Sequence, residues 1–177
     1  MTKIKNITVW IGETAPTPLG VLWIAMSENG LWASSYDISR EQFIAEVLHR
    51  GSVNIVEDPE KVTAGLAQLS EFLEGKRRAF DLPIDWAGMT DFQVAVRQAT
   101  MAIPFGETST YGDVAASVGQ PRAARAVGRV QATNPLTLVV PCHRVLGADG
   151  GLHGYGGSGG LKTKAWLLNL EGAQFTS

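Results

Sequence analysis

One stretch decides how the second half of this chain folds: residues 110–145, which read TYGDVAASVGQPRAARAVGRVQATNPLTLVVPCHRV. Thr110 can cap a short helix that ends near Gly119, and Pro121 suits the first position of a second helix that reaches to about Thr133. Two short helices joined by a turn that contains glycine are typical of a helix-turn-helix. The stretch therefore predicts a mostly helical domain that contains a helix-turn-helix.

The second of these helices combines arginines with very small residues. Arg122, Arg125 and Arg129 are spaced three and four apart, which places them along one side of a helix. The residues between them are small: Ala123, Ala124, Ala126 and Gly128. Such a helix can approach another surface closely and direct its arginines at phosphates. The alternative is a solvated arginine face above alanines that pack on the core. No side chain suited to reading base edges accompanies the arginines, so we expect sequence-independent binding.

Charge is distributed unevenly along the chain. The sequence has 15 basic and 17 acidic residues and a net charge of −2, which by itself argues against a nucleic-acid partner. Between Val114 and Val145, however, there are four arginines and no Asp, Glu or Lys. The net charge therefore hides a basic segment beside the single cysteine of the chain.

That cysteine, Cys142, is a candidate nucleophile. It follows an apolar, strand-like run at residues 136–140 and lies between Pro141 and His143. A thiolate usually needs a neighbouring base in order to form near neutral pH, and an imidazole can serve. Adjacent residues of a regular strand point to opposite faces, so the pair requires a turn, which Pro141 permits. The alternative is an inert, buried cysteine beside a surface histidine.

A working imidazole also needs a third group that orients it. From the sequence that group could be Asp113, Asp149 or Glu171. Asn134 lies a short distance before the cysteine, and its side chain could brace the turn through a hydrogen bond.

The first half predicts a small α+β domain at residues 1–85. Strand patterns occur at 6–11, 20–26, 31–36 and 53–56, helical patterns at 40–48 and 59–73, and a last strand at 79–84 that contains Pro83 and so belongs at a sheet edge. Residues 86–91 form a linker, and residues 92–177 form the second domain. Thr90 and Gln93 fit a capping box for a helix that runs to about Ala102. A final helix at about 161–170 ends at Gly172.

Composition places the chain among globular proteins, with 45% hydrophobic and 18% charged residues. It shows no apolar run of membrane-spanning length and no secretory signal. A single cysteine excludes an intramolecular disulfide, and three dispersed histidines give no zinc pattern. We therefore expect a cytoplasmic monomer, with no membrane partner, no metal and no cofactor.

Several motifs resemble those of the O6-alkylguanine-DNA alkyltransferases. They occur in order over about residues 92–172: Pro104-Phe105-Gly106-Glu107 with Thr110-Tyr111-Gly112-Asp113-Val114-Ala115, then Ala123-Ala124-Arg125-Ala126-Val127-Gly128, Asn134-Pro135, Pro141-Cys142-His143-Arg144-Val145, and Lys164-Ala165-Trp166-Leu167-Leu168 with Glu171-Gly172. The resemblance implies an α+β fold, with a ribonuclease H-like N-terminal domain and a winged-helix-like C-terminal domain.

The resemblance also implies an activity, direct-reversal DNA repair by a methylated-DNA–protein-cysteine methyltransferase. Cys142 would take the alkyl group from O6-alkylguanine in duplex DNA, with O4-alkylthymine as a further candidate substrate. The reaction would follow nucleotide flipping, would be irreversible, and would occur once per molecule. A bacterial member would associate with the nucleoid.

Individual roles follow from the same resemblance. His143, held by Glu171 and acting through a water, would help to form the thiolate, while Asn134 would brace the turn and Tyr111 would assist the departing guanine. Arg125 would enter the duplex in place of the flipped nucleotide, and Ala123, Ala124 and Ala126 would allow its helix to lie in the minor groove. Val145, Tyr155, Ser158 and Lys164 would belong to the substrate pocket.

One segment departs from the family pattern. The family commonly has Gly-Tyr-x-Gly-Gly-Leu before its last helix, whereas residues 154–161 carry two extra residues. This segment would form a wall of the alkyl pocket, and the extra glycines could make that wall mobile enough to admit larger alkyl groups.

Three other functions remain open at this stage. A non-enzymatic alkyltransferase-like protein binds lesions without repairing them, but such proteins replace the cysteine that this chain keeps. A Cys-His hydrolase would need an oxyanion hole, which nothing near Cys142 indicates. A transcription regulator could use the helix-turn-helix, with the thiol as a sensor.

Overall fold

The computed structural model describes residues 5–176, which form two compact units. One unit contains the chain up to Met89 together with Pro135–Val139, and the other contains Thr90–Asn134 and the chain from Val140 onward. The helices and strands, in order, are β1 (Lys5–Glu13), β2 (Leu22–Ser27), β3 (Gly30–Tyr36), α1 (Arg40–His49), β4 (Ser52–Glu57), α2 (Pro59–Leu73), α3 (Asp91–Met101), β5 (Ser109–Thr110), α4 (Tyr111–Ser117), α5 (Ala124–Ala132), the 3₁₀ helix η1 (Cys142–Arg144), β6 (Val145–Leu146) and α6 (Gly160–Glu171).

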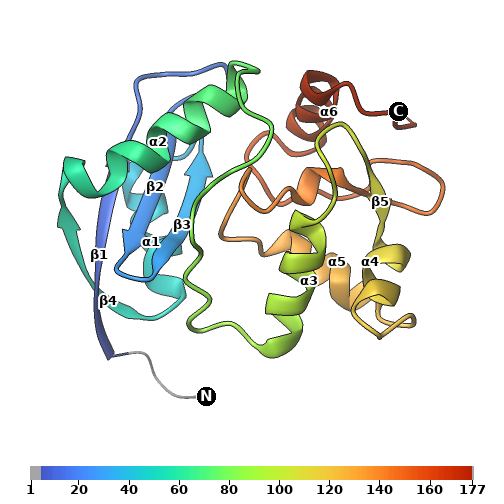
Figure 1. Cartoon of the computed structure of the whole chain (residues 1–177), viewed down its shortest axis with the longest axis horizontal. Helices are drawn as coiled ribbons and strands as arrows, with labels where there is room; N and C mark the ends of the chain where they lie inside the picture. Colours follow the sequence, from blue (N-terminus) through green and yellow to red (C-terminus); the bar gives the residue numbers. More distant parts are fainter. Residues whose placement is uncertain (1–4, 177) are drawn as a thin grey trace. The chain divides into compact units, whose positions relative to one another are not determined.

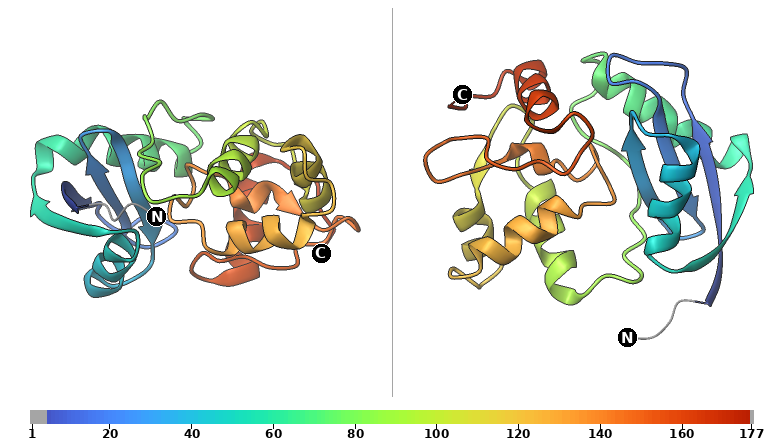
Figure 2. Two further views of the ribbon diagram at one scale, coloured as in Figure 1. Left: turned by 90° about the horizontal axis from the view of Figure 1, so that it is seen from below. Right: turned by 180° about the vertical axis from the view of Figure 1, so that it is seen from behind.

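The first unit is a four-stranded sheet covered on both faces by helices (Figures 1 and 2). The strand order is β3-β2-β1-β4, with antiparallel pairs except for β4, which joins β1 in parallel. Side chains alternate along β2: the Trp23 ring stacks on Phe43 of α1 at 5.5 Å, whereas Ile24 lies against Gly65 of α2. The absence of a side chain at Gly65 lets α2 approach the sheet closely.

Two sequence expectations for this unit are corrected. Residues 79–84 form no strand; Ile84 alone bridges Leu31 of the edge strand β3. Residues 136–140, which the apolar pattern suggested as a strand, form none: Leu136 makes a single bridge to Ser34, and the residues after it form a turn with Leu138 at φ +71°. Apolar character in this run reflects burial, because Leu136 and Leu138 are almost fully enclosed.

The segment Pro135–Val139 belongs to the first unit through one residue of β3. Ser34 donates its backbone N–H to Pro135 O at 2.9 Å and its hydroxyl to Thr137 O at 2.8 Å, and Thr137 returns its hydroxyl to Ser34 O at 2.7 Å. This segment lies within the range 92–177 that the sequence assigned to the second domain. The residues on either side of it, Asn134 and Val140, both belong to the second unit.

The second unit begins with α3, which follows the predicted boundaries closely. Thr90 is the N-cap, and its reciprocal hydrogen bonds with Gln93 complete a capping box. Helix α4 begins in the same way, with a capping box between Thr110 and Asp113. Apolar side chains of α3, α4, α5 and β6 form one core, which includes Val96, Val114, Val127 and Val145.

Helix α5 starts later than the sequence predicted. Pro121 and Arg122 lie in a turn, closed by a hydrogen bond from Ala123 N to Gln120 O at 2.8 Å, and the first helical residue is Ala124. Arg122 therefore precedes the helix, while Arg125 and Arg129 lie on it. In the part of the chain that the structure describes, no helix has the length and apolar character needed to cross a membrane.

Candidate active site

Cys142 is the first residue of the single turn η1. Backbone hydrogen bonds from Arg144 N to Pro141 O at 2.9 Å and from Val145 N to Cys142 O close this turn, and a tighter turn with Cys142 N donating to Val140 O at 2.8 Å precedes it. Residues of a 3₁₀ turn project about 120° apart, so the thiol and the imidazole of His143 leave the turn in different directions. Both side chains are buried, with His143 fully enclosed.

Cys142 lines a cavity of about 270 Å³ within the second unit. Its lining comes from α4, α5, η1 and the loop at residues 147–159, called the glycine-rich loop below: Tyr111, Gly128, Gln131, Ala132, Cys142, Gly154, Tyr155 and Gly156. The sequence placed Tyr155 in the pocket wall, and it lines this cavity. Ser158, assigned to the same wall, is not among the lining residues.

Asn134 makes a direct contact with the thiol. Its Nδ2 donates to Val140 O at 2.9 Å and to Cys142 Sγ at 3.4 Å. Burial raises the pKa of the Cys142 thiol, and the Asn134 hydrogen bond together with the charges of Lys164 and Arg97 lowers it. The site thus contains three groups that favour the thiolate, whereas burial of the sulfur disfavours it.

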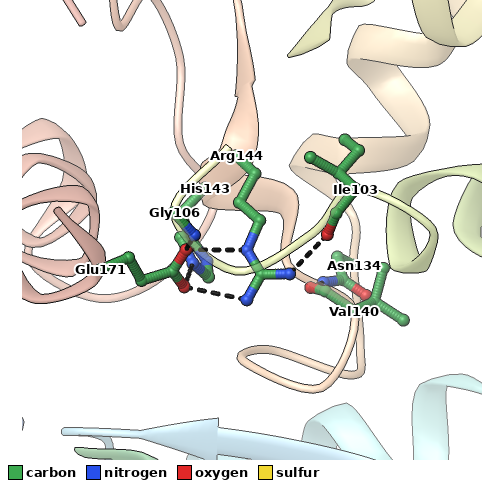
Figure 3. A network of polar contacts seen from close by, with 7 residues as sticks. All are labelled: Ile103, Gly106, Asn134, Val140, His143, Arg144 and Glu171. Carbon is green, nitrogen blue, oxygen red and sulfur yellow. Dashed lines mark hydrogen bonds and ion pairs between the residues drawn. The ribbon is translucent and has the colours of Figure 1, made fainter. Parts of the chain in front are cut away.

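His143, Glu171 and Arg144 form a buried charged network (Figure 3). Glu171 Oε1 lies 2.7 Å from His143 Nε2 and accepts from Arg144 Nη2 at 3.0 Å, while Oε2 accepts from Arg144 Nε at 2.9 Å and from Gly106 N at 3.1 Å. Arg144 Nη1 also donates to Ile103 O at 2.6 Å. Of the three acids that the sequence offered, Glu171 is the one that meets the imidazole.

The charges in this network fix the protonation of His143. Burial alone would raise the pKa of Glu171, but the hydrogen bonds from His143 and Arg144 lower it to about 2. Burial lowers the pKa of His143. An ionised Glu171 can only accept a hydrogen bond, so His143 Nε2 carries the proton and Nδ1 is the basic nitrogen.

The family resemblance placed Lys164 in the substrate pocket. In the structure Lys164 does not line the cavity but anchors the glycine-rich loop, which does. Its buried Nζ donates to three carbonyls, Val145 O at 2.7 Å, Leu152 O at 2.6 Å and Gly154 O at 3.1 Å. Burial lowers the pKa of Lys164 to about 8. Val145 contributes to the site through this carbonyl, since its side chain is part of the core.

The glycine-rich loop also packs closely against α5. A Cβ at Gly156 would lie 2.3 Å from Ala132 O, so a larger residue could not occupy this position without moving the backbone. Tyr111 also lines the cavity, and its hydroxyl donates to Gly154 O of the loop at 3.5 Å. Burial raises the pKa of Tyr111, so its phenol stays protonated.

A wider hollow of about 570 Å³ lies beside this cavity and includes the start of α5. Exposed Arg125 lines it together with Ala124, Gly128 and Tyr111, so Tyr111 borders both spaces. Arg129 is exposed on the same helix. Ala123 is the N-cap of α5, and Ala126 is half-buried. Arg122, displaced from the helix, lies apart with Pro121.

Other candidates make separate pairs. Asp113 caps α4 through Thr110, and Asp149 lies 2.7 Å from His153 at the surface. Within residues 5–176, no group of three or more His, Cys, Asp or Glu side chains is placed to hold a metal ion.

Sequence reasoning did not assign a role to three buried polar residues. Arg144 was visible only as part of a motif, and its pairing with Glu171 joins positions 27 residues apart. Gln131 lines the cavity, where its Nε2 donates to Thr100 Oγ1 at 2.6 Å. Arg97 lies on the buried face of α3 with Val96 and Thr100.

The fold and the site define a class of protein in which a helix-turn-helix unit carries a buried cysteine beside a histidine that a carboxylate orients. Residues 91–173 match the DNA-binding domain of 6-O-methylguanine DNA methyltransferase, and residues 11–86 match its ribonuclease-like domain. The chain belongs to the 6-O-methylguanine DNA methyltransferase family.

Individual relatives agree with this assignment. The constitutive methylated-DNA–protein-cysteine methyltransferase of Bacillus subtilis is 41% identical over 162 residues, which cover 89% of this chain and 93% of the relative. The inducible enzyme of the same organism is 38% identical over 162 residues, covering 92% and 84%. The crystal structure of Mycobacterium tuberculosis OGT in complex with DNA has a TM-score of 0.75 and 35% identity, covering 93% of this chain and 92% of that one. The fold and family expected from the sequence are therefore confirmed.

Proposed function

We propose that this protein repairs DNA by transferring the alkyl group of O6-alkylguanine to Cys142, irreversibly and once per molecule. One observation carries the proposal: Cys142 lines a cavity and its Sγ accepts a hydrogen bond from Asn134, while the adjacent His143 is oriented by Glu171. The family relationship supports the reaction type, and the relatives are named for alkyl transfer from methylated DNA to a protein cysteine.

The chemistry is a displacement at the alkyl carbon. His143 Nδ1 accepts the thiol proton through a water, and Glu171 stabilises the imidazolium that results. The thiolate attacks the alkyl carbon, so a sulfur–carbon bond forms while the bond from that carbon to O6 breaks. The electron pair of the broken bond leaves with guanine. The Tyr111 phenol donates a proton to this departing base, and the proton from the thiol replaces it through His143 and water.

A thioether product explains the expected stoichiometry. No water attacks the new sulfur–carbon bond, and the thiol is not regenerated. Each molecule therefore reacts once, and the reaction needs no metal or cofactor to activate the nucleophile.

Access to the cavity requires the damaged base to leave the helical stack. The thiol is buried, and a base inside a duplex could not reach it. Arg125 is exposed at the hollow that adjoins the cavity, where it can fill the space of a flipped nucleotide. The small residues of α5 suit close approach to a minor groove.

Intact-mass spectrometry of the protein after incubation with O6-methylguanine duplex DNA tests this proposal. We expect an increase of about 14 Da, one methylene, located on Cys142 and limited to one per molecule. A Cys142→Ser variant should gain no mass but should still bind DNA. An unmodified protein would indicate lesion binding or regulation, and repeated turnover would indicate a hydrolase. A parallel incubation with O4-methylthymine DNA tests whether that base is a second substrate.

A further inference from the structure

A buried arginine lies in the second unit without a role in the reaction described above. Arg97 of α3 is only 2% exposed, and its guanidinium donates to Thr133 O at 3.2 Å and to Gln93 O at 3.4 Å. Burying a guanidinium is costly, because the charge loses its hydration. The neighbours of the guanidinium indicate what this costly charge does.

The contact with Thr133 links Arg97 to the nucleophile. The next residue, Asn134, donates from Nδ2 to both Val140 O and Cys142 Sγ. A shift of the Thr133 carbonyl would therefore move the amide that holds the thiol. Arg97 is in this way one hydrogen bond and one peptide unit away from the residue that contacts Sγ.

The charges of Arg97 and of the Cys142 thiolate also act on each other directly. Burial lowers the pKa of Arg97 to about 10, so it stays protonated at neutral pH, and a thiolate at Cys142 raises it. The reverse effect is that Arg97 lowers the pKa of Cys142. In a site of low dielectric such an attraction is much stronger than in water.

Other titratable groups surround the thiol, and they must be separated from Arg97 in any test. Lys164 of α6 also carries a positive charge near the thiol, and Tyr111 of α4 is a neutral phenol. His143 is paired with Glu171, whose charge is balanced by Arg144. Arg97 is the cation that α3 contributes to this environment.

We propose that Arg97 is a positioning residue for alkyl transfer, holding the Thr133–Asn134 turn and placing a buried positive charge that stabilises the Cys142 thiolate. This inference rests on the proposed function, in which the thiolate is the nucleophile. It assigns to α3 an active part in the site, in addition to its part in the core.

The single cysteine of the chain allows a direct test, because the pH dependence of its alkylation by iodoacetamide, read by intact mass, reports the Cys142 thiolate alone. Arg97→Gln keeps a donor for Thr133 O but removes the charge, whereas Arg97→Lys keeps the charge. We expect the thiolate titration of Arg97→Gln to move to higher pH and that of Arg97→Lys to remain close to the wild type. If Arg97→Gln does not fold, Arg97→Met serves as the neutral variant.

The rate of transfer gives a second readout. With free O6-benzylguanine, which removes DNA binding from the measurement, Arg97→Gln should react on the order of tenfold more slowly at neutral pH, because an opposite charge at close range shifts a pKa by about one unit or more. The difference should disappear at alkaline pH, where the thiolate forms without help. A purely structural role would lower the rate at every pH.

Thr100→Val is the matched control. Thr100 is buried one turn further along α3 and accepts from Gln131 without carrying charge, so its loss should lower the melting temperature and leave the thiol titration unchanged. The proposal is overturned if Arg97→Gln and the wild type titrate at the same pH while Cys142 still accepts an alkyl group. If the wild type accepts no alkyl group, the proposed function fails instead, and the titration still decides the effect of Arg97 on the thiol.

Discussion

Arg144 holds Glu171 through both carboxylate oxygens, with Nε 2.9 Å from Oε2 and Nη2 3.0 Å from Oε1. This two-point contact fixes the plane of the carboxylate, and the remaining direction at Oε1 is taken by His143. The imidazole is therefore oriented by Glu171, which is itself held rigidly by Arg144, the residue that follows His143 in the chain.

Glu171→Gln should damage both stability and transfer. The variant leaves the Arg144 charge buried without its counter-ion, a change that typically costs about 3–5 kcal/mol of unfolding free energy. It also removes the anion that stabilises the imidazolium, so the second-order rate of transfer should fall by about 10²-fold. Urea unfolding and single-turnover transfer measure the two effects. Glu74→Gln, at an exposed ion pair with Lys76, should change neither, and equal losses in both variants would contradict the assignment.

The network also predicts a loss of stability in acid. The pKa of Glu171 is about 2 in the folded protein against an ordinary 4.5, so its contribution is complete above about pH 4.5 and is lost as the pH falls toward 2. His143 acts in the same direction, because its folded pKa lies below 6.5 and acid must charge a buried ring. Urea unfolding should therefore show falling stability from pH 6.5 downward. The fall below pH 4.5 should be shallower in Glu171→Gln, and an equal slope in both proteins would show that Glu171 is not responsible.

The sequence predicted local structure well wherever local interactions determine it. The capping box of α3 and the boundaries of α2 follow from neighbouring residues, and both were predicted. The apolar run at residues 136–140 was misread as a strand because periodicity cannot distinguish a buried turn from a buried strand, and the hydrogen bonds that decide it come from Ser34, about a hundred residues away.

The site shows the same division. Cys142 and His143 are adjacent in sequence and could be paired by inspection, while the choice of Glu171 over Asp113 and Asp149 came from the family resemblance alone. Pro121 fits both a turn and a helix start, so the displacement of Arg122 from α5 depends on packing. Arg97 gave no signal, since a lone arginine in a helix usually faces solvent.

Arg125→Ala should separate base flipping from chemistry. Arg125 lines the hollow next to the cavity but not the cavity that contains Cys142, so the variant should react normally with free O6-benzylguanine. Its transfer from duplex O6-methylguanine DNA should fall more than about tenfold, because the flipped state loses the side chain that fills its space.

Arg122→Ala is the control for this prediction, because Arg122 lies outside α5. We expect this variant to weaken DNA binding about equally at all sequences and to reduce the salt slope by about one. Equal effects of the two variants on duplex transfer would contradict a special role for Arg125.

Lys164→Met tests whether the glycine-rich wall controls the size of the alkyl group. The Nζ of Lys164 ties Leu152 and Gly154 to Val145, next to the nucleophile, and each of these three carbonyls would lose a charged donor. Hydrogen exchange should then increase at residues 152–156. The ratio of benzyl to methyl transfer should increase about threefold or more, because each lost hydrogen bond removes about 1 kcal/mol or more that held the wall. The overall rate at neutral pH should also fall, since Lys164 lowers the pKa of Cys142. The ratio of the two rates, rather than either rate, is therefore the readout.

Lys162→Met, on the exposed side of α6, is the control and should leave hydrogen exchange and alkyl selectivity unchanged. A faster-exchanging wall with an unchanged ratio would show that loop mobility does not determine which alkyl groups enter.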